Sequence, residues 1–403
     1  MSEHLGEYCT FVRGVTFQNG DTRTKGTDGL VPLLRAGNIS RRLDLENDVI
    51  WVPSSLVSAD QQLRAGDIVI CLSSGSPQVV GKSAQLIDDW NGTVGAFCGI
   101  VRPKQNVDPP FLACWFQSSA FWKWRDMQAR GANIQNLRFS ELAGLAVSFP
   151  PIYQQRRIAA RLREELATIT EARAALEAQL DAAEALPSAN LKSIFQSSEA
   201  QRWPCRRLED ISEISGGVTL GRALRERSTR NVAYMRVANV KDGHLDLTDV
   251  KTTPATEAEI AALRLKKGDI LLTEGGDPDK LGRGTFWRGE IAECIHQNHI
   301  FRVRFDASRF EPAFMAFQFG SAYGKAYFAA HAKQTTGIAT INRRVLGAFP
   351  LMTPPLKTQR ALATRLDAEY SVATALRLSL AAKLSEIEKL PAALLRAAFA
   401  PSC

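Results

Sequence analysis

The spacing of apolar residues predicts two long amphipathic helices in this chain of 403 residues, one beginning near Pro150 and one ending near Pro391. In both segments apolar residues recur every three or four positions, which is the spacing of one helix face. In the first segment they are Ile158, Leu162, Leu166, Ile169, Leu176 and Leu180, and in the second Leu362, Leu366, Tyr370, Ala373, Leu380 and Leu384. The first helix would end near Pro187, about 50 Å from its start at ~1.5 Å per residue. Because such a stripe needs a partner, we expect the two helices to pair antiparallel.

The segments before the helices, 1–149 and 203–353, predict short strands and a few helices. "GDIVICL" and "GDILLT" are β-rich runs that open with Gly-Asp. Residues Ile300 to Phe305 alternate apolar and basic side chains, as a half-exposed strand does. "PPFLACWFQSSAFWKWRDM" and "EPAFMAFQFGSAYGKAYFAA" predict helices that begin near proline and bury aromatic residues. The predicted fold class is α+β, with two globules separated by two long helices.

The two halves of the chain are related by an internal repeat. "LRAGNI" at 34–39 matches "MRVANV" 201 positions later, and "LRAGDIVI" at 63–70 matches "LKKGDILL" 202 positions later. "PPIYQQR" at 150–156 matches "PPLKTQR" with an offset of 204. The order is kept and the offset drifts by only a few residues. Each half therefore contains the same two parts, a globule and then a helix.

The loop "SSGSPQVVGKS" at 73–83 resembles a phosphate-binding loop of nucleotide enzymes but has the wrong spacing. Such a loop needs four residues between its two glycines, and Gly75 and Gly81 are separated by five. In the second copy the loop becomes "GDPDKLGR", so the shared feature is a Gly/Pro turn that ends in Lys82 or Arg283. This turn suits a rigid loop beside a phosphate backbone, or is a hairpin turn with an exposed cation.

Two further motifs suggest chemistry that the rest of the sequence does not support. "DPPF" at 108–111 resembles the catalytic tetrapeptide of adenine-N6 methyltransferases, but the glycine-rich cofactor loop of those enzymes is missing, and prolines at helix starts explain the motif. Cys294, His296 and His299 offer three ligands where a structural zinc site usually wants four. We therefore expect no catalytic site and no metal, and we expect these histidines to pack or to read DNA in the second copy alone.

The composition of the chain indicates the kind of partner and the cellular compartment to expect. The formal net charge of +8 is compatible with an anionic partner, nucleic acid first. The sequence has no apolar run long enough to span a membrane and no signal peptide at its start. The seven cysteines are scattered without metal-finger spacing, which favours reduced thiols in a cytoplasmic protein.

With this duplicated plan, the sequence resembles the specificity subunits of type I restriction–modification systems over nearly its whole length. Globules of that family end in a segment like Pro-(Ile/Leu)-Pro-Pro-Leu-x-Glu-Gln, and "VSFPPIYQQRRI" and "PLMTPPLKTQRAL" fit it except that Gln154 and Thr358 replace the Glu. "QTTGIATIN" at 334–342 fits the family pattern Gln-x-(Ser/Thr)-Gly-x-x-x-x-Asn, of which "ARGANIQN" keeps Gly131 and Asn136.

The resemblance implies a division of labour. Residues 1–149 and 203–353 would be target recognition domains, each reading one half of a bipartite, asymmetric site in double-stranded DNA. Residues 150–202, the central helical spacer, and residues 354–403, the C-terminal helical region, would set the gap between half-sites and dock two methylation subunits, to which restriction subunits are added. The chain itself would be no enzyme and would hold no cofactor, because S-adenosylmethionine and ATP/Mg belong to the partner subunits.

Candidate contacts follow from side-chain chemistry: arginine can fork onto guanine, asparagine or glutamine onto adenine, and lysine mostly meets phosphate. The candidates for DNA binding are Arg35, Asn38, Ser74, Lys82, Arg130 and Asn133 in the first domain, and Arg236, Asn239, Lys280, Arg283, Gln334 and Thr335 in the second. The candidates for docking methylation subunits are Gln155, Arg156, Gln359 and Arg360. The residues that both copies share have a structural alternative, since domains of different specificity should differ at base contacts. Two other functions stay open: a coiled-coil scaffold without a DNA role, and a nucleic-acid enzyme with an unrecognised site.

Overall fold

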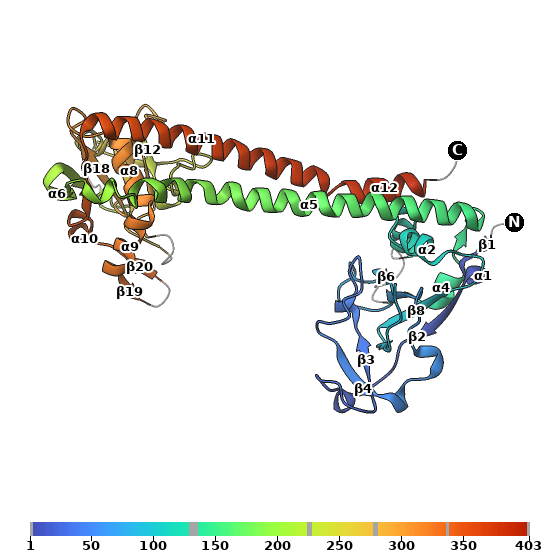
Figure 1. Ribbon diagram of the computed structural model, residues 1–403. Coiled ribbons are helices and arrows are strands. Elements are labelled where there is room, and N and C mark those ends of the chain that lie inside the picture. The colour runs from blue at the N-terminus through green and yellow to red at the C-terminus, as the bar shows by residue number, and fades with distance from the viewer. Residues whose placement is uncertain (1–2, 129–135, 224–227, 277–280, 336–337, 401–403) are drawn as a thin grey trace. The chain divides into compact units, whose positions relative to one another are not determined.

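The structure is a computed structural model that describes residues 3–128, 136–223, 228–276, 281–335 and 338–400 (Figure 1). The chain forms two compact units. The first unit is Met1–Glu177 together with Ala382–Cys403, and the second unit is Ala178–Ala381. Each unit therefore contains one globule and a part of both long helical regions. The predicted domain boundaries after residues 149, 202 and 353 divide the chain into consecutive segments. The two compact units instead group segments that pack together in space.

The first globule is built on two small sheets. The four-stranded antiparallel sheet has the order β2 (Cys9–Arg13), β8 (Cys98–Pro103), β5 (Ile68–Cys71) and β6 (Ser83–Gln85). The three-stranded sheet has the order β4 (Ile50–Pro53), β3 (Leu30–Leu34) and β7 (Thr93–Val94), with β3 and β7 parallel. β5 is buried along its whole length, which explains its unbroken apolar sequence after Gly-Asp. Short elements complete this globule: α1 (Leu5–Tyr8), α4 (Phe139–Ala143), and the pair β1 (Glu3–His4) and β9 (Ala146–Val147).

The second globule repeats this plan. Its four-stranded sheet has the order β11 (Ser212–Ser215), β18 (Ile300–Phe305), β14 (Ile270–Thr273) and β16 (Gly284–Phe286). Its three-stranded sheet has the order β13 (Lys251–Ala255), β12 (Arg230–Met235) and β17 (Cys294–His296). Around them lie α6 (Leu208–Ile211), α7 (Glu257–Leu263), α10 (Arg343–Gly347), and the pair β10 (Cys205–Arg207) and β21 (Pro350–Met352). The predicted α+β class and the predicted repeat are confirmed.

The prediction for β18 was correct in the strand and wrong in its exposure. β18 lies between β11 and β14, and all of its residues except Arg304 are buried, so it is not a half-exposed strand. Arg302 is only 2% exposed, and it donates hydrogen bonds to the carbonyl of Ala262 at 3.0 Å and to Glu213 at 2.7 Å. Arg302 is buried and Arg304 is half-buried, and both have acidic partners that the alternating pattern alone does not reveal.

Each globule carries a pair of helices in the predicted place: α2 (Pro109–Phe116) and α3 (Ser119–Gln128) in the first, α8 (Pro312–Gly320) and α9 (Ala322–His331) in the second. α2 begins with proline as expected, and the carboxylate of Asp108 caps it by accepting a hydrogen bond from the Phe111 amide at 3.2 Å. The "DPPF" motif is thus a helix start in this structure. Buried aromatic rings of both pairs pack in the core of their globules.

The long helices differ in their continuity. α5 (Ile152–Phe195) has 44 residues and continues through Pro187, where we expected it to end. α11 (Leu356–Ile387) stops before α12 (Leu390–Ala398), which has Pro391 in its first turn. Packing maintains α5 beyond its proline, because Leu191, Ile194 and Phe195 lie in the core of the second unit and offset the backbone hydrogen bond that proline removes.

The helices pair antiparallel, as predicted. In the first unit Leu166 of α5 and Leu395 of α12 line the same groove, whereas Arg173, about two turns later, forms an ion pair with Glu388 at 3.8 Å. Residue numbers on one helix rise as those on the other fall. Figure 1 shows α12 beside α5 in the first unit and α11 beside α5 in the second. No helix within the described ranges is long and apolar enough to cross a membrane.

Candidate nucleic-acid interface

In the second globule two loops from distant parts of the sequence meet in a small sheet. β15 (Gly275–Gly276), which opens the "GDPDKLGR" loop, pairs with β20 (Ile338–Thr340), and β20 pairs with β19 (Lys333–Thr335) of the "QTTG" segment. Figure 1 shows β19 and β20 at the end of this globule farthest from the long helices. The structure thus brings together two segments that the sequence had suggested separately as DNA-binding loops.

The first globule joins its equivalent loops at the same place. Ser73 forms a bridge with Asn136, and the Leu137 amide donates a hydrogen bond to the Leu72 carbonyl at 2.7 Å. The same bond recurs in the second globule, from Ile341 to Glu274, at 2.8 Å. Both copies therefore present their loop pair from one framework. We call these pairs the paired loops, 72–82 with the segment before Leu137, and 274–283 with 333–341.

The structure describes some of the candidate residues in the paired loops. The Ser74 hydroxyl accepts a hydrogen bond from the Ser76 amide at 3.2 Å, within its own turn. For Gln334 and Thr335 the structure defines the backbone pairing with Ala339 and Ile338. The candidates Arg130, Asn133 and Lys280 lie outside the described residues. Their DNA contacts stay predictions.

The second glycine of the Gly/Pro turn has a structural reason in both copies. Gly81 and Gly282 have φ of +89° and +62°, in the left-handed region that favours glycine. A side chain at Gly282 would also meet the ring of Phe328 at 2.2 Å. In the first copy the turn connects the antiparallel strands β5 and β6, and Lys82 is exposed beyond it, whereas Arg283 of the second copy is half-buried. Both interpretations of this turn, hairpin and phosphate-facing loop, remain compatible with this geometry.

Asn38 and Asn239 have a structural role. Asn38 is 2% exposed; its side-chain oxygen accepts a hydrogen bond from the Arg35 amide at 2.8 Å, and its NH₂ donates to the carbonyls of Asp44 at 3.2 Å and Asn47 at 2.7 Å. Asn239 is buried and makes the equivalent bonds in its own loop. Their amides are engaged within the chain, which favours the structural alternative for this pair.

Arg35 and Arg236 keep part of their hydrogen-bonding capacity. Arg35 is exposed and donates from Nη2 to the Asp48 carbonyl at 3.1 Å. Arg236 donates from Nη2 to the carbonyl and to the carboxylate of Asp249, at 2.7 and 2.8 Å. These bonds orient both side chains, and a role in DNA contact stays a prediction for them.

Gln155 and Gln359, candidates for docking, are buried at 1% and 2% exposure. Gln155 accepts a hydrogen bond from the Asp108 amide at 2.9 Å and donates to the Pro150 carbonyl at 2.8 Å. Gln359 does the same with the Glu311 amide at 2.9 Å and the Pro354 carbonyl at 2.7 Å. Each glutamine fastens the first turn of a long helix to the start of α2 or α8, which is a structural role.

Arg156 and Arg360, the other docking candidates, are accessible. Their side chains are 72% and 58% exposed, and each has its nearest carboxylate, Asp108 or Glu311, almost 4 Å away. Exposed ion pairs of this length contribute little to stability. Both arginines therefore remain available to a partner chain.

A buried ion pair common to both globules escaped the sequence analysis. Asp67, 1% exposed, accepts hydrogen bonds from Arg102 at 2.9 and 2.8 Å, and Asp269, 1% exposed, accepts them from Arg304 at 2.6 and 2.7 Å. The aspartates are those of the two Gly-Asp motifs. The signal was present, because the acidic and the basic residue recur with the same offset of 202.

The histidines near Cys294 do not form a common site. His296 is fully buried, burial lowers its pKa to about 4, and its Nδ1 lies 3.0 Å from the Ile300 carbonyl. His299 is exposed and lies 2.8 Å from the Glu274 carboxylate. Within the part of the chain that the structure describes, no three His, Cys, Asp or Glu residues are grouped in a way that could hold a metal ion.

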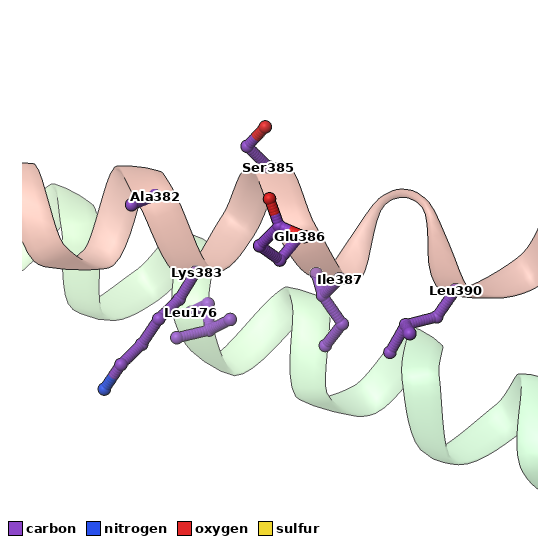
Figure 2. A pocket seen from close by; sticks show the side chains of 7 residues that line it. All are labelled: Leu176, Ala382, Lys383, Ser385, Glu386, Ile387 and Leu390. Atoms are coloured by element: carbon purple, nitrogen blue, oxygen red, sulfur yellow. The ribbon is translucent and has the colours of Figure 1, made fainter.

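An apolar groove lies on the helices of the first unit, at the break between α11 and α12 (Figure 2). Ile387 and Leu390 point toward α5, where Leu176 contributes the opposite wall. Leu390 is 45% exposed. Lys383, Ser385 and Glu386 of α11 line the same groove and give it a polar edge.

Comparison with known proteins identifies the class that this arrangement defines. Residues 201–386 match the family described as Type I restriction modification DNA specificity domain. The chain is similar to the EcoKI specificity subunit of Escherichia coli (strain K12) and to the StySPI specificity subunit of Salmonella potsdam. It is 26% identical to each, over 97% of this chain and 86% of the relative.

The fold is also that of a solved structure, the HsdS subunit from Thermoanaerobacter tengcongensis, with a TM-score of 0.66 and 17% identity over 99% of this chain and 96% of that one. The fold is thus shared over nearly the whole chain. Residues 201–386 thus match the specificity family, and nearly the whole chain is similar to specificity subunits of type I restriction–modification systems.

Proposed function

We propose that this chain selects the DNA sequence on which a type I restriction–modification complex acts. The observation that carries the proposal is the repeated position of the paired loops: Ser73 joins Asn136 in one globule, and Gly275 joins Thr340 in the other. One framework presents two loop pairs of different sequence. This arrangement suits two domains that read different halves of an asymmetric site, and the net charge of +8 favours the phosphate backbone.

The helices would set the gap between the two half-sites. α5 belongs partly to the first unit and partly to the second, and it passes Pro187 without ending. In dimeric DNA readers the distance between reading elements determines half-site spacing. We infer the same role for the helix that links the two globules here.

Methylation and restriction subunits are the proposed partners, with S-adenosylmethionine and ATP/Mg bound on those subunits. Arg156, Arg360 and the groove between Leu176 and Leu390 supply accessible surface for docking. This chain would be non-catalytic, since Asp108 of "DPPF" caps a helix and His296 is buried in a core. Neither a scaffold without a DNA role nor a nucleic-acid enzyme has a supporting feature within the described ranges.

The test is methylation profiling. The chain is expressed with its cognate methylation subunit in a host without adenine methylation, and modified bases are located genome-wide. We expect one bipartite motif with a fixed gap. Exchange of segment 274–283 should alter one half of the motif, and exchange of segment 73–82, the matched change in the other copy, should alter the other half. An assembled complex that leaves the genome unmodified contradicts the proposal.

A further inference from the structure

The two units have equivalent grooves between globule and helices, and the grooves differ in charge. In the first unit a groove of about 650 Å³ is lined by the loop after β3, by β6, α2, α3, α5 and α12. Its cations come from three separate segments: Arg41 and Arg42, Lys82, and Arg163. None of the four forms an ion pair with any residue that the structure describes, and all four are exposed. We call this the cationic groove.

The second unit balances the charges of its own groove, which has a volume of about 370 Å³. Arg288 of the globule forms an ion pair with Asp367 of α11. Lys325 of α9 forms one with Asp242 at 2.5 Å, and the Tyr370 hydroxyl donates a hydrogen bond to the Asp242 carbonyl at 3.0 Å. Carboxylates of the chain itself therefore occupy this groove and neutralise its cations.

The internal repeat shows which residues make the charges of the two grooves differ. Arg163 is equivalent to Asp367, 204 positions later, so the first copy has a cation where the second copy has a helix carboxylate. Arg41 and Arg42 lie in the loop that holds Asp242 in the second copy. Conversely, the second copy's cations have apolar equivalents: Ile87 for Arg288 and Trp122 for Lys325. Ile87 is 67% exposed.

We infer that the cationic groove binds an amphipathic segment of another protein chain, with carboxylates next to apolar side chains. Four cations in one recess repel one another, and carboxylates placed among them would form charge-assisted hydrogen bonds. The second unit shows that this groove geometry accommodates carboxylates. The apolar side chains favour protein over DNA, because a phosphodiester would pair with the cations and leave Ile87 and Trp122 exposed.

The inference rests on the proposed function in one respect: the partner is sought among the methylation and restriction subunits of the same complex. The probe is therefore the full chain assembled with those subunits. Arg163→Asp introduces the residue of the second copy. Arg161→Asp is the matched control, because it changes the charge of the same helix by the same amount about 200° away around the helix axis. We expect Arg163→Asp to weaken binding of one partner by about tenfold or more, and Arg161→Asp to leave it near the wild-type value. Thermal unfolding of each variant verifies that it is folded.

A zero-length cross-link identifies the chemistry of the occupant. In an Arg163→Lys variant, a carbodiimide activates a partner carboxylate, the lysine amine attacks it, and an amide forms as the urea leaves. We expect mass spectrometry to find this amide to an aspartate or glutamate of a partner subunit. If partner affinity is unchanged, and Arg163→Asp instead reduces DNA affinity and the salt slope of DNA binding by about one, the groove binds DNA and the inference is overturned. No change in either affinity also overturns it. A cross-link in a complex that fails to methylate a defined motif would contradict the proposed function and support the groove.

Discussion

Phe399, which directly follows α12, packs against Phe111 of α2 with ring centroids 5.3 Å apart, and Phe195 of α5 packs in the same way against Phe314 of α8 at 5.5 Å. The two contacts are equivalent in the internal repeat. Each globule is thus closed by the end of the helical segment that follows the other globule in the sequence. The repeat unit of the sequence and the folded unit of the structure are therefore different pieces of chain.

Replacing either closing phenylalanine should destabilise one unit selectively. Phe195 is 3% exposed, so Phe195→Ala should lower the free energy of unfolding of the second unit by about 3–5 kcal/mol. Phe399 is half-buried, so Phe399→Ala should cost the first unit less, about 1–2 kcal/mol. Hydrogen exchange read by mass spectrometry distinguishes the units. Faster exchange around Phe314 in Phe399→Ala would contradict this assignment.

The buried glutamines at the starts of the long helices should matter for stability. Gln155→Ala leaves the Asp108 amide and the Pro150 carbonyl without partners in a buried place, which costs about 1–3 kcal/mol. Gln359→Ala should have a similar effect in the second unit. Urea unfolding measures both losses, and the neighbouring, less buried Gln154→Ala is the control. An effect of Gln154→Ala as large as that of Gln155→Ala would show that the buried amide is not the cause.

Removing one member of the Asp67–Arg102 ion pair should reduce the free energy of unfolding more than replacing both members together. Arg102→Leu leaves the carboxylate of Asp67 buried and unpaired, and should cost about 3–5 kcal/mol. The double variant with Asp67→Asn should recover part of this loss. Urea unfolding of both single variants and the double variant gives the coupling energy. Additive losses would mean that the two side chains do not depend on each other.

The second unit should lose stability as pH falls from about 6.5 toward 4. Burial, with a smaller contribution from the charge of Arg302, lowers the pKa of His296 to about 4, whereas the unfolded chain has the usual value of 6.5. Between these values the unfolded state binds a proton that the folded state does not, so acid favours unfolding. His296→Gln should flatten the dependence of unfolding free energy on pH in this window, measured by chemical denaturation. The exposed His299→Gln should keep the wild-type slope, and a flattened slope there would contradict the assignment to His296.

Periodicity and repetition made most of the fold predictable. The stripe from Ile158 to Leu180 predicts the long helix because one apolar face requires a partner, and Gly-Asp followed by apolar residues predicts β5 and β14. The end of α5 was not predictable, because Pro187 is a local signal and the packing of Phe195 that overrides it is made with distant residues. The predicted exposure of β18 was wrong for the same reason, because the partners of Arg302 and Arg304 lie far away in the sequence.

The sequence predicted which loops form the candidate site better than it predicted which of their side chains are free to contact DNA. Comparison of the copies located both members of each loop pair, whereas their meeting at Ser73 and at Gly275 depends on strand pairing. Residues shared by both copies, such as Asn38 and Gln155, proved to be fastened inside the chain. Positions that differ between the copies pointed to a candidate binding surface, as Arg163 in place of Asp367 shows, whereas shared positions did not.

The division into interleaved units reverses the expected order of maturation on the ribosome. Domains ordinarily fold as they emerge, the N-terminal one first. Here every residue of the second unit has been synthesised at Ala381, but the first unit still lacks Ala382–Cys403. Until α12 and the residue after it emerge, Phe111 of α2 lacks its contact with Phe399, and the groove beside Leu166 of α5 lacks the wall that Leu395 provides. The part of the protein that is translated first is thus completed last, and a nascent chain halted shortly before its end would carry one finished unit and one open unit.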